Sequence, residues 1–211
     1  MEIVSFSQLP STQHFLLEAL SHGTLETPVA VITEEQVSGV GSRDNQWEGG
    51  KGNFFASFAI AIEKLPSDLP LGSASIYFSY IMKQTLVDFD EEVWLKWPND
   101  FYYKHEKVGG TITQKVGDVV VCGMGINLKK TSNAYASLET TIDPKVLLEA
   151  YLKSLEKFPS WKQIFSEYEI EFEKSRAFSA HIENQKTNLL EAILCQDGSL
   201  IINQKKVFSL R

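Results

Sequence analysis

The segment Lys96-Trp97-Pro98-Asn99-Asp100, followed seven residues later by Lys107-Val108-Gly109-Gly110, carries the strongest signal in this chain. The apolar residues 93–95 before it predict a buried strand, and Pro98 with Asn99 predicts a turn. A hairpin then brings back a second lysine beside two glycines, which let a ligand approach the backbone closely. Two cations, a carboxylate and bare backbone suit an anionic substrate, although a Pro-Asn-Asp turn also occurs without any function.

Apolar spacing and turn residues predict an α+β chain around this unit. Ser11-Thr12 is expected to begin a helix, with Ser11 as its cap, and residues 71–89 are expected to form a long helix. Further strands are expected at residues 28–33, 53–62, 93–97, 100–103, 108–115 and 119–127, and further helices at residues 144–157 and 161–176. Residues 34–51 are polar and contain glycines, so we expect a long loop, which in a compact domain is usually functional or disordered.

The C-terminal part of the chain has a different pattern. Short apolar runs at residues 189–194, 200–202 and 207–210 alternate with turn residues. They predict a small antiparallel sheet or barrel appended to a larger domain. We therefore expect a main domain over residues 1–178 and a small β domain over residues 179–211.

Composition narrows the function classes. The chain has 211 residues, is 43% hydrophobic and carries a formal charge of −7, so it can bury a core and lacks the basic excess of a non-specific nucleic-acid binder. Its first residues lack the basic segment followed by an apolar run that is typical of a signal peptide. No apolar stretch approaches the roughly 20 residues that span a bilayer. Cys122 and Cys195 are expected to be reduced thiols. These features predict a cytoplasmic protein that binds neither DNA nor a membrane.

A glycine-containing segment at residues 39–47 is a second candidate for ligand binding. Gly39 and Gly41 expose backbone N–H groups that can contact phosphate oxygens, and Arg43 adds a charge. Trp47 offers a flat face on which a purine can stack. An ordinary surface loop with a tryptophan packed on the core explains the same residues, because a single glycine-rich loop is weak evidence.

Taken together, these motifs resemble biotin protein ligase. The resemblance rests on Lys96-Trp97-Pro98-Asn99-Asp100, on Lys107 with Gly109-Gly110, and on Gly123-Met124-Gly125-Ile126-Asn127, in this order after the loop that ends at Trp47. It implies a mixed sheet flanked by helices, as in the class II synthetase-like catalytic domain of these ligases, with a C-terminal SH3-like β-barrel. No N-terminal helix-turn-helix module is evident, so the likeness is to the short, monofunctional class.

The resemblance also implies roles for individual residues. The catalytic residues would be Lys107, Asp100 and Arg43. The biotin contacts would be Ser11, Thr12, Gln36, Gly39, Lys107, Gly109, Gly110, Gly123 and Gly125. The nucleotide contacts would be Gly41, Arg43, Trp47, Asn99 and Asn127. The metal ligands are unknown.

The sequence departs from the family pattern in two places. Val40 and Ser42 stand where the family's loop commonly has arginine, and Gln13 replaces a frequent asparagine after Ser-Thr. We hypothesise that Arg43 supplies the missing charge.

The implied activity is an ATP-dependent, AMP-forming ligase reaction with magnesium. Biotin would be activated to biotinyl-5′-AMP and transferred to a lysine of a biotin carboxyl carrier protein domain, of acetyl-CoA carboxylase or a related biotin enzyme. The alternatives are a lipoate or octanoate protein ligase or transferase and, in another class, a non-catalytic sensor of biotin or biotinyl-adenylate.

Overall fold

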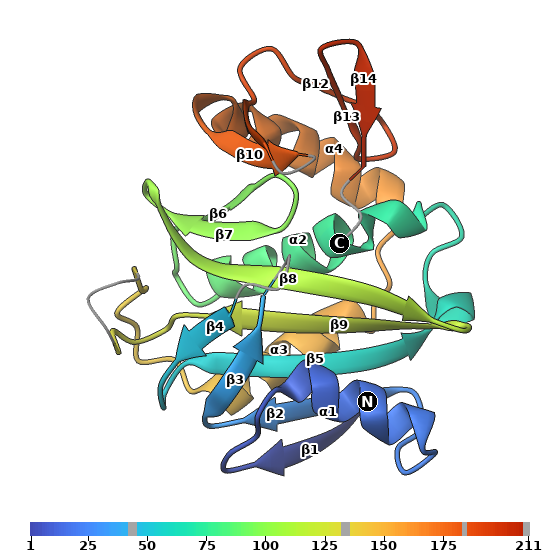
Figure 1. Cartoon of the computed structure of the whole chain (residues 1–211), viewed down its shortest axis with the longest axis vertical. Coiled ribbons are helices and arrows are strands. Elements are labelled where there is room, and N and C mark those ends of the chain that lie inside the picture. The colour runs from blue at the N-terminus through green and yellow to red at the C-terminus, as the bar shows by residue number, and fades with distance from the viewer. Residues whose placement is uncertain (42–45, 132–135, 183–184, 209–211) are drawn as a thin grey trace.

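The computed structural model describes residues 1–41, 46–131, 136–182 and 185–208, and its centre is a seven-stranded sheet. The strand order is β1-β2-β5-β9-β8-β7-β6 (Figure 1). These strands are β1 (Glu2–Phe6), β2 (Val29–Thr33), β5 (Phe54–Ala61), β6 (Val93–Lys96), β7 (Asp100–Tyr103), β8 (Glu106–Val116) and β9 (Val119–Ile126). β1 runs parallel to β2 and the other neighbours are antiparallel, which confirms the predicted mixed sheet.

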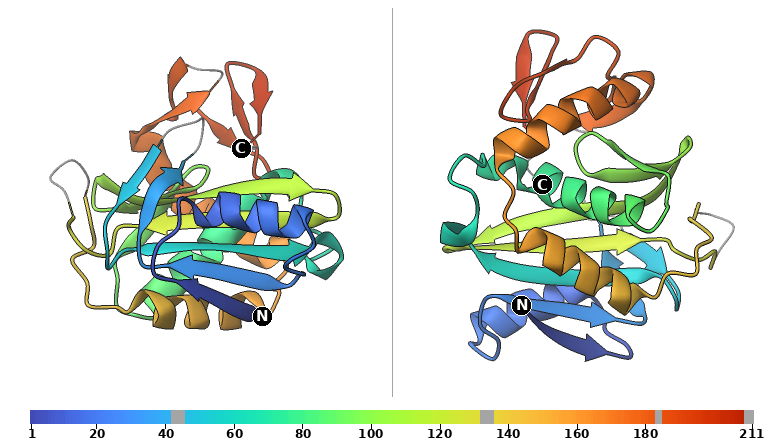
Figure 2. Two further views of the ribbon diagram at one scale, coloured as in Figure 1. Left: turned by 60° about the horizontal axis from the view of Figure 1, so that its bottom comes forward. Right: turned by 180° about the vertical axis from the view of Figure 1, so that it is seen from behind.

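Helices cover both faces of this sheet. Helix α1 (Thr12–Ser21) lies on one face, while α2 (Ala74–Val87) and α3 (Pro144–Leu155) lie on the other (Figures 1 and 2). The side chain of Ser11 accepts a hydrogen bond from the N–H of His14, so Ser11 caps α1 as predicted. Short 3₁₀ turns are η2 (Ile62–Lys64), η3 (Leu71–Ser73), which precedes α2, and η4 (Glu173–Ala177), which follows α4 (Trp161–Phe172).

Each face of the main sheet has its own hydrophobic core, because side chains alternate between the two faces along each strand. Phe58 and Cys122 are paired across β5 and β9 and belong to the large core beneath α2 and α3. Ala59 and Val121, one position along, belong to a smaller core with Leu16 of α1. One strand pair therefore supplies both cores.

The structure corrects the prediction for residues 34–51. In place of a long loop, it has a hairpin of β3 (Gln36–Val40) and β4 (Gln46–Gly49). The prediction failed because the glycines and polar residues of this hairpin hide the alternation of a strand, and Val37 is exposed. Strand β1 was also not predicted, since five residues at a sheet edge carry little pattern.

The C-terminal strands form two small antiparallel sheets. One contains β10 (Ser179–Ile182) and β11 (Gln185–Asn188), and the other contains β12 (Ile193–Leu194), β13 (Leu200–Ile202) and β14 (Lys205–Val207). They lie beyond the β6 edge of the main sheet, beside α4 (Figure 1). The small β unit is confirmed, whereas its closure into a barrel and a domain boundary at residue 178 remain predictions.

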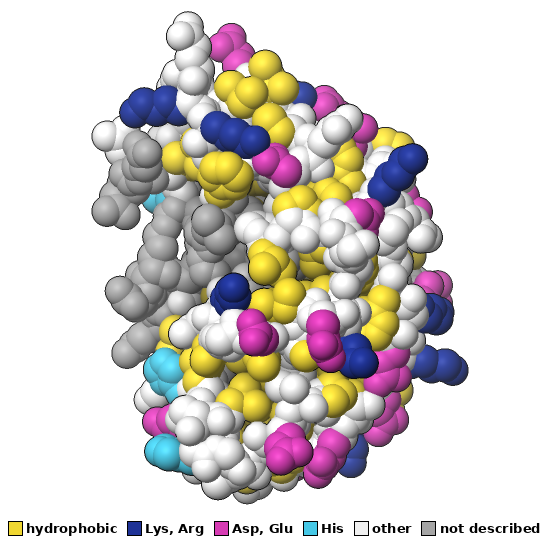
Figure 3. Space-filling model, turned by 90° about the vertical axis from the view of Figure 1, so that its right-hand side faces the viewer, with side chains coloured by type: hydrophobic (Ala, Val, Ile, Leu, Met, Phe, Trp, Pro, Cys, Tyr) yellow, Lys and Arg dark blue, Asp and Glu magenta, His cyan; other side chains and the backbone are white. Residues whose placement is uncertain are grey.

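In the part of the chain that the structure describes, we find no helix that is long and apolar enough to cross a bilayer. On the face shown in Figure 3, acidic and basic side chains are interspersed among apolar ones rather than gathered by sign.

Candidate active site

A hollow lies on the same sheet face as α1, beyond the end of the small core. Ser57 of β5 pairs with Gly123 of β9, and Gly125 of β9 pairs with Gly110 of β8. Gly110 in turn pairs with Asp100 of β7. Because the three neighbouring strands β5, β9 and β8 present glycine or serine here, they leave a cavity of about 450 Å³.

A polar cluster lines this cavity where α1 begins. The backbone N–H and the hydroxyl of Thr12 both donate to Oε1 of Gln36, at 2.8 and 3.1 Å. The Thr12 hydroxyl also lies 2.9 Å from the hydroxyl of Ser57. Oε1 of Gln13 is buried and has no hydrogen-bond partner in the described part of the chain. The cluster therefore offers donors and acceptors to a polar ligand group.

The charged residues of the cavity form a compact group. Nζ of Lys107 lies 2.6 Å from one carboxylate oxygen of Asp100, and Nζ of Lys96 lies 3.2 Å from the other. Burial raises the pKa of the Asp100 carboxyl, but the two ammonium groups outweigh burial and hold this pKa below its ordinary value. Lys96 is nearly buried, whereas the Lys107 side chain is 40% exposed and therefore accessible to an anion.

The two asparagines of the motifs also hold the backbone around the cavity. Nδ2 of Asn99 donates to the carbonyl of Thr111, whose own N–H donates to the carbonyl of Asn99. Nδ2 of Asn127 donates to the carbonyl of Ala136. Both residues line the cavity, so they form part of its wall as well as holding this backbone in place.

The β3–β4 hairpin brings Trp47 into the cavity. Gly39 pairs with Trp47, and a Cβ atom at Gly39 would lie 2.5 Å from the Trp47 carbonyl oxygen. The indole lies against the backbone of Gly125, where a Cβ atom would be 2.6 Å from the ring. Nε1 of Trp47 is buried and has no hydrogen-bond partner within the described residues. Arg43 lies outside the described residues.

Most of the predicted site residues meet in this one cavity. Those that line it are Ser11, Thr12, Gln36, Gly41, Trp47, Asn99, Asp100, Lys107, Gly110, Gly123, Gly125 and Asn127. Gly39 and Gly109 lie in the adjoining strands but do not line it. Their roles as biotin contacts therefore have less structural support than the others.

The structure adds lining residues that were not predicted. They are Gln13, Val40, Ser57, Thr111, Ile112 and Met124. Ser57 had a usable signal, because it is a polar residue in the middle of an otherwise apolar strand. Gln13 had another, because it directly follows the Ser-Thr pair at a helix start.

Comparisons with known proteins agree with this architecture. The model of the "Biotin/lipoate A/B protein ligase family" matches residues 5–129. A biotin acetyl coenzyme A carboxylase synthetase from Helicobacter pylori, solved with bound biotinylated ATP, is 35% identical, with a TM-score of 0.94 over 98% of this chain and 99% of that chain.

Two more distant relatives are consistent with the family match. The bifunctional ligase/repressor BirA of Escherichia coli is 32% identical over 127 residues, which are 57% of this chain and 38% of that protein. This chain thus spans well under two thirds of that relative. A biotin protein ligase from Aquifex aeolicus, 17% identical with a TM-score of 0.77 over 98% of this chain and 94% of that chain, shares the fold. The family match covers more than half of the sequence, and the chain belongs to the biotin/lipoate A/B protein ligase family.

Proposed function

We propose that this protein is a biotin protein ligase, which activates biotin with ATP and transfers it to a lysine of a biotin carboxyl carrier protein domain. One observation carries the proposal: a single cavity joins a polar cluster, a glycine floor and the Lys107–Asp100 pair. The similarity of the whole chain to the Helicobacter pylori synthetase, which was solved with biotinylated ATP, supports it.

The polar cluster favours biotin over lipoate. The ureido ring of biotin needs both hydrogen-bond donors and acceptors, whereas the dithiolane ring of lipoate needs neither. Thr12, Gln36 and Ser57 supply hydroxyl and amide groups on a buried wall of the cavity. These groups already contact one another, but the buried Oε1 of Gln13 beside them has no partner among the described residues. An apolar ring would leave this oxygen unsatisfied, at a cost of about 1–3 kcal/mol.

Lys107 would act in the first half-reaction. The biotin carboxylate attacks the α-phosphorus of ATP, a bond to the phosphorus forms, and pyrophosphate leaves. Two anions must meet in this step, so a nearby ammonium stabilises the charge of the transition state. Because Lys107 is partly exposed and faces the cavity, it can exchange its contact with Asp100 for one with the substrates.

Magnesium would enter with ATP, bound through the phosphate oxygens of the nucleotide. Among the described residues, no group of three or more His, Cys, Asp or Glu side chains could hold a metal ion. Asp100, the carboxylate of the described cavity wall, is already paired with two lysines. These residues do not fit a protein-built magnesium cage, which agrees with a metal that is part of the substrate.

Asp100 would act in the second half-reaction. The ε-amine of the acceptor lysine attacks the acyl carbon of biotinyl-5′-AMP, an amide forms and AMP leaves. The pKa of Asp100 is lowered, so this group stays ionised at neutral pH and is a weak base. Its better-supported role is to orient the incoming amine through its charge.

The β3–β4 hairpin would cover the nucleotide. Stacking of Trp47 on adenine would require the indole to exchange its packing against Gly125 for packing against the base. Closure over the site would exclude water and protect the mixed anhydride from hydrolysis. Arg43 would add a charge to this loop, in place of the family's arginines at positions 40 and 42.

The acceptor would be a carrier domain of acetyl-CoA carboxylase or a related biotin enzyme. We expect the reaction to occur in the cytoplasm, without DNA or a membrane.

The direct test is incubation with biotin, ATP, magnesium and an acceptor domain, followed by mass spectrometry of the acceptor. A ligase adds one biotinyl group to one lysine. Competition between biotin and lipoate distinguishes the two acyl substrates, and lipoate incorporation alone would overturn the proposal. Biotin binding without biotin-dependent ATP–pyrophosphate exchange would identify a sensor instead.

A further inference from the structure

The strand that leads into the charged turn is held by side chains from a distant part of the sequence. β6 lies at the end of the seven-stranded sheet, so its outward N–H groups face no further strand of that sheet. Oε1 of Glu171, in α4, accepts from the N–H of Leu95 at 3.3 Å. The hydroxyl of the fully buried Ser175, in η4, accepts from the N–H of Trp97 at 3.1 Å. The backbone before Asp100 is thus fixed from outside the sheet.

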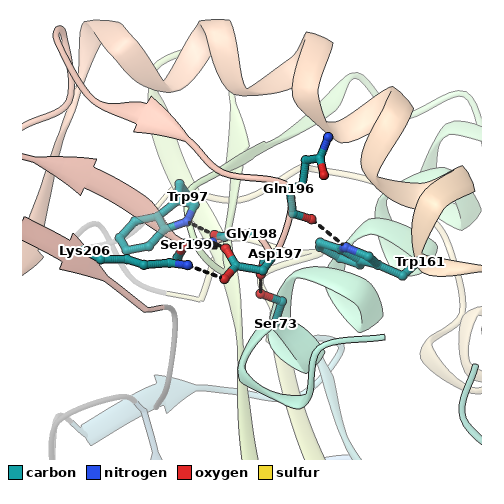
Figure 4. A network of polar contacts seen from close by, with 8 residues as sticks. All are labelled: Ser73, Trp97, Trp161, Gln196, Asp197, Gly198, Ser199 and Lys206. Atoms are coloured by element: carbon teal, nitrogen blue, oxygen red, sulfur yellow. Dashed lines mark hydrogen bonds and ion pairs between the residues drawn. The ribbon is translucent and has the colours of Figure 1, made fainter. Parts of the chain in front are cut away.

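The side chain of Trp97 is held by the small β unit. Its indole is 1% exposed and donates from Nε1 to the carbonyl of Gly198 at 3.0 Å. Gly198 belongs to the turn of residues 196–199 between β12 and β13, here named the β12–β13 turn. Figure 4 shows this turn against the indole. In the sequence, Lys96 directly precedes Trp97, and Asp100 follows it three residues later.

The β12–β13 turn has a fixed shape. The carboxylate of Asp197 accepts from the N–H of Ser199 at 3.2 Å and pairs with Lys206 at 2.7 Å. Its backbone carbonyl accepts from the hydroxyl of Ser73 at 2.5 Å. Gly198 has φ +77°, and a Cβ atom there would collide with Ser73. The Gly198 carbonyl therefore points in a set direction.

A second tryptophan contacts the same turn and provides a natural comparison. Nε1 of Trp161, in α4, donates to the carbonyl of Gln196 at 2.8 Å, on the other side of the turn from Trp97 (Figure 4). Both indoles therefore dock the small β unit onto the rest of the molecule. Trp97 differs because it also belongs to the turn that carries Lys96 and Asp100.

We propose that the β12–β13 turn positions the Lys96–Asp100 segment for catalysis, through the Gly198 carbonyl and Trp97, and that Ser175 supports the same backbone. Trp97, Gly198 and Ser175 are positioning residues, since they act through the charged groups and do not line the cavity. The inference rests on the proposed ligase function. A small displacement of a reacting group can lower a rate by about 100-fold, so contacts of this kind influence turnover.

The test compares Trp97→Phe with Trp161→Phe in the full chain. Each variant loses one indole donor to the same turn, so both are expected to lower Tm by a similar few degrees. Trp97→Phe is expected to lower kcat of biotin-dependent ATP–pyrophosphate exchange by about 10-fold, with KM for biotin within about 2-fold. Trp161→Phe is expected to leave both constants within about 2-fold of the parent.

Equal losses of kcat in the two variants, or no loss in either, would show that the turn is only a structural contact. If Trp97→Phe does not fold, Ser175→Ala tests the same segment at its backbone, with Ser166→Ala as the control on α4. Ser175→Ala is expected to lower kcat by about 3-fold, in the range of one neutral hydrogen bond. An unchanged kcat in folded Ser175→Ala would overturn the proposal.

A second readout does not depend on ligase activity. Carboxyl NMR titration follows the pKa of Asp100, which is expected to rise toward its ordinary value in Trp97→Phe but not in Trp161→Phe, because the displaced turn loosens the contacts with both lysines. Identical Asp100 titrations in all three proteins would contradict positioning. Absence of biotin-dependent exchange in the parent would reject the ligase function alone.

Discussion

The sheet face that carries the site has two halves with opposite packing. In one half, Leu16 of α1 packs with Ala59 and Val121 of the sheet, and these fully buried side chains fill the space. Two residues further along β5 and β9, Ser57 and Gly123 leave the face open. The same strands thus stabilise the fold in one half and hold a ligand site in the other, depending on the size of the side chain at each position.

Lys107→Ala should cause the largest change in the open half. We expect adenylate formation to slow by at least ~100-fold, because the ammonium that offsets the charge of the transition state is lost. A pyrophosphate-release assay measures this step. Lys115→Ala, at an exposed position of the same strand, is the matched control, and a near-parental rate in Lys107→Ala would exclude the proposed role.

Gly125→Ala tests the open half against the filled half. Its Cβ atom would lie 2.6 Å from the Trp47 ring, so the indole must move. Overpacking costs about 1–3 kcal/mol, which predicts roughly 5- to 150-fold weaker binding of biotinyl-adenylate in calorimetry, with a change in tryptophan fluorescence.

The counterpart in the filled half is Ala59→Gly. Removal of a fully buried methyl group and the added backbone freedom should lower the free energy of unfolding by about 1–2 kcal/mol. Ligand affinity should stay unchanged. If Ala59→Gly weakened binding as much as Gly125→Ala, the division of the face into two halves would be wrong.

Asp100→Asn should slow the reaction less than Lys107→Ala does. It should also lower the stability of the protein by an amount that depends on pH. We expect transfer from preformed adenylate to slow by about 10-fold in a single-turnover assay, the value of one charge-assisted hydrogen bond. An unchanged rate would count against this role.

The stability effect of Asp100 has a defined direction. Because its folded pKa lies below the unfolded value, the ion pairs stabilise the parent fully above about pH 4, and this contribution is lost as pH falls through the folded pKa. Chemical denaturation between pH 2 and 7 should therefore show that the difference in stability between the parent and Asp100→Asn shrinks in acid.

Thr12→Val should produce the smallest effect. The variant keeps the shape of the side chain but removes the hydroxyl that contacts Gln36 and Ser57. A loss of about 1 kcal/mol corresponds to roughly 5-fold weaker biotin binding by calorimetry. Affinity for ATP should be unaffected. A larger loss of affinity for ATP than for biotin would show that biotin does not bind beside Thr12.

Much of this arrangement was predictable from the sequence. Lys107, Asp100 and the paired glycines form a pattern with a chemical reason, and their strands were expected. Ser57 and Gln13 each had a local signal, but they were not predicted as site residues. Strand pairing and helix placement bring them into the cavity, and the local signal alone does not determine either. The β3–β4 hairpin was missed because its tertiary contacts with the start of α1 outweigh its weak strand pattern.

The cavity floor draws on β5, β7, β8 and β9, and its wall includes the first turn of α1. A molecule that fills it would therefore cross-link the beginning of the chain to a hairpin nearly a hundred residues later. Since such a ligand binds only the folded form, occupancy should raise the melting temperature and slow amide exchange across the entire sheet, well beyond the atoms it touches.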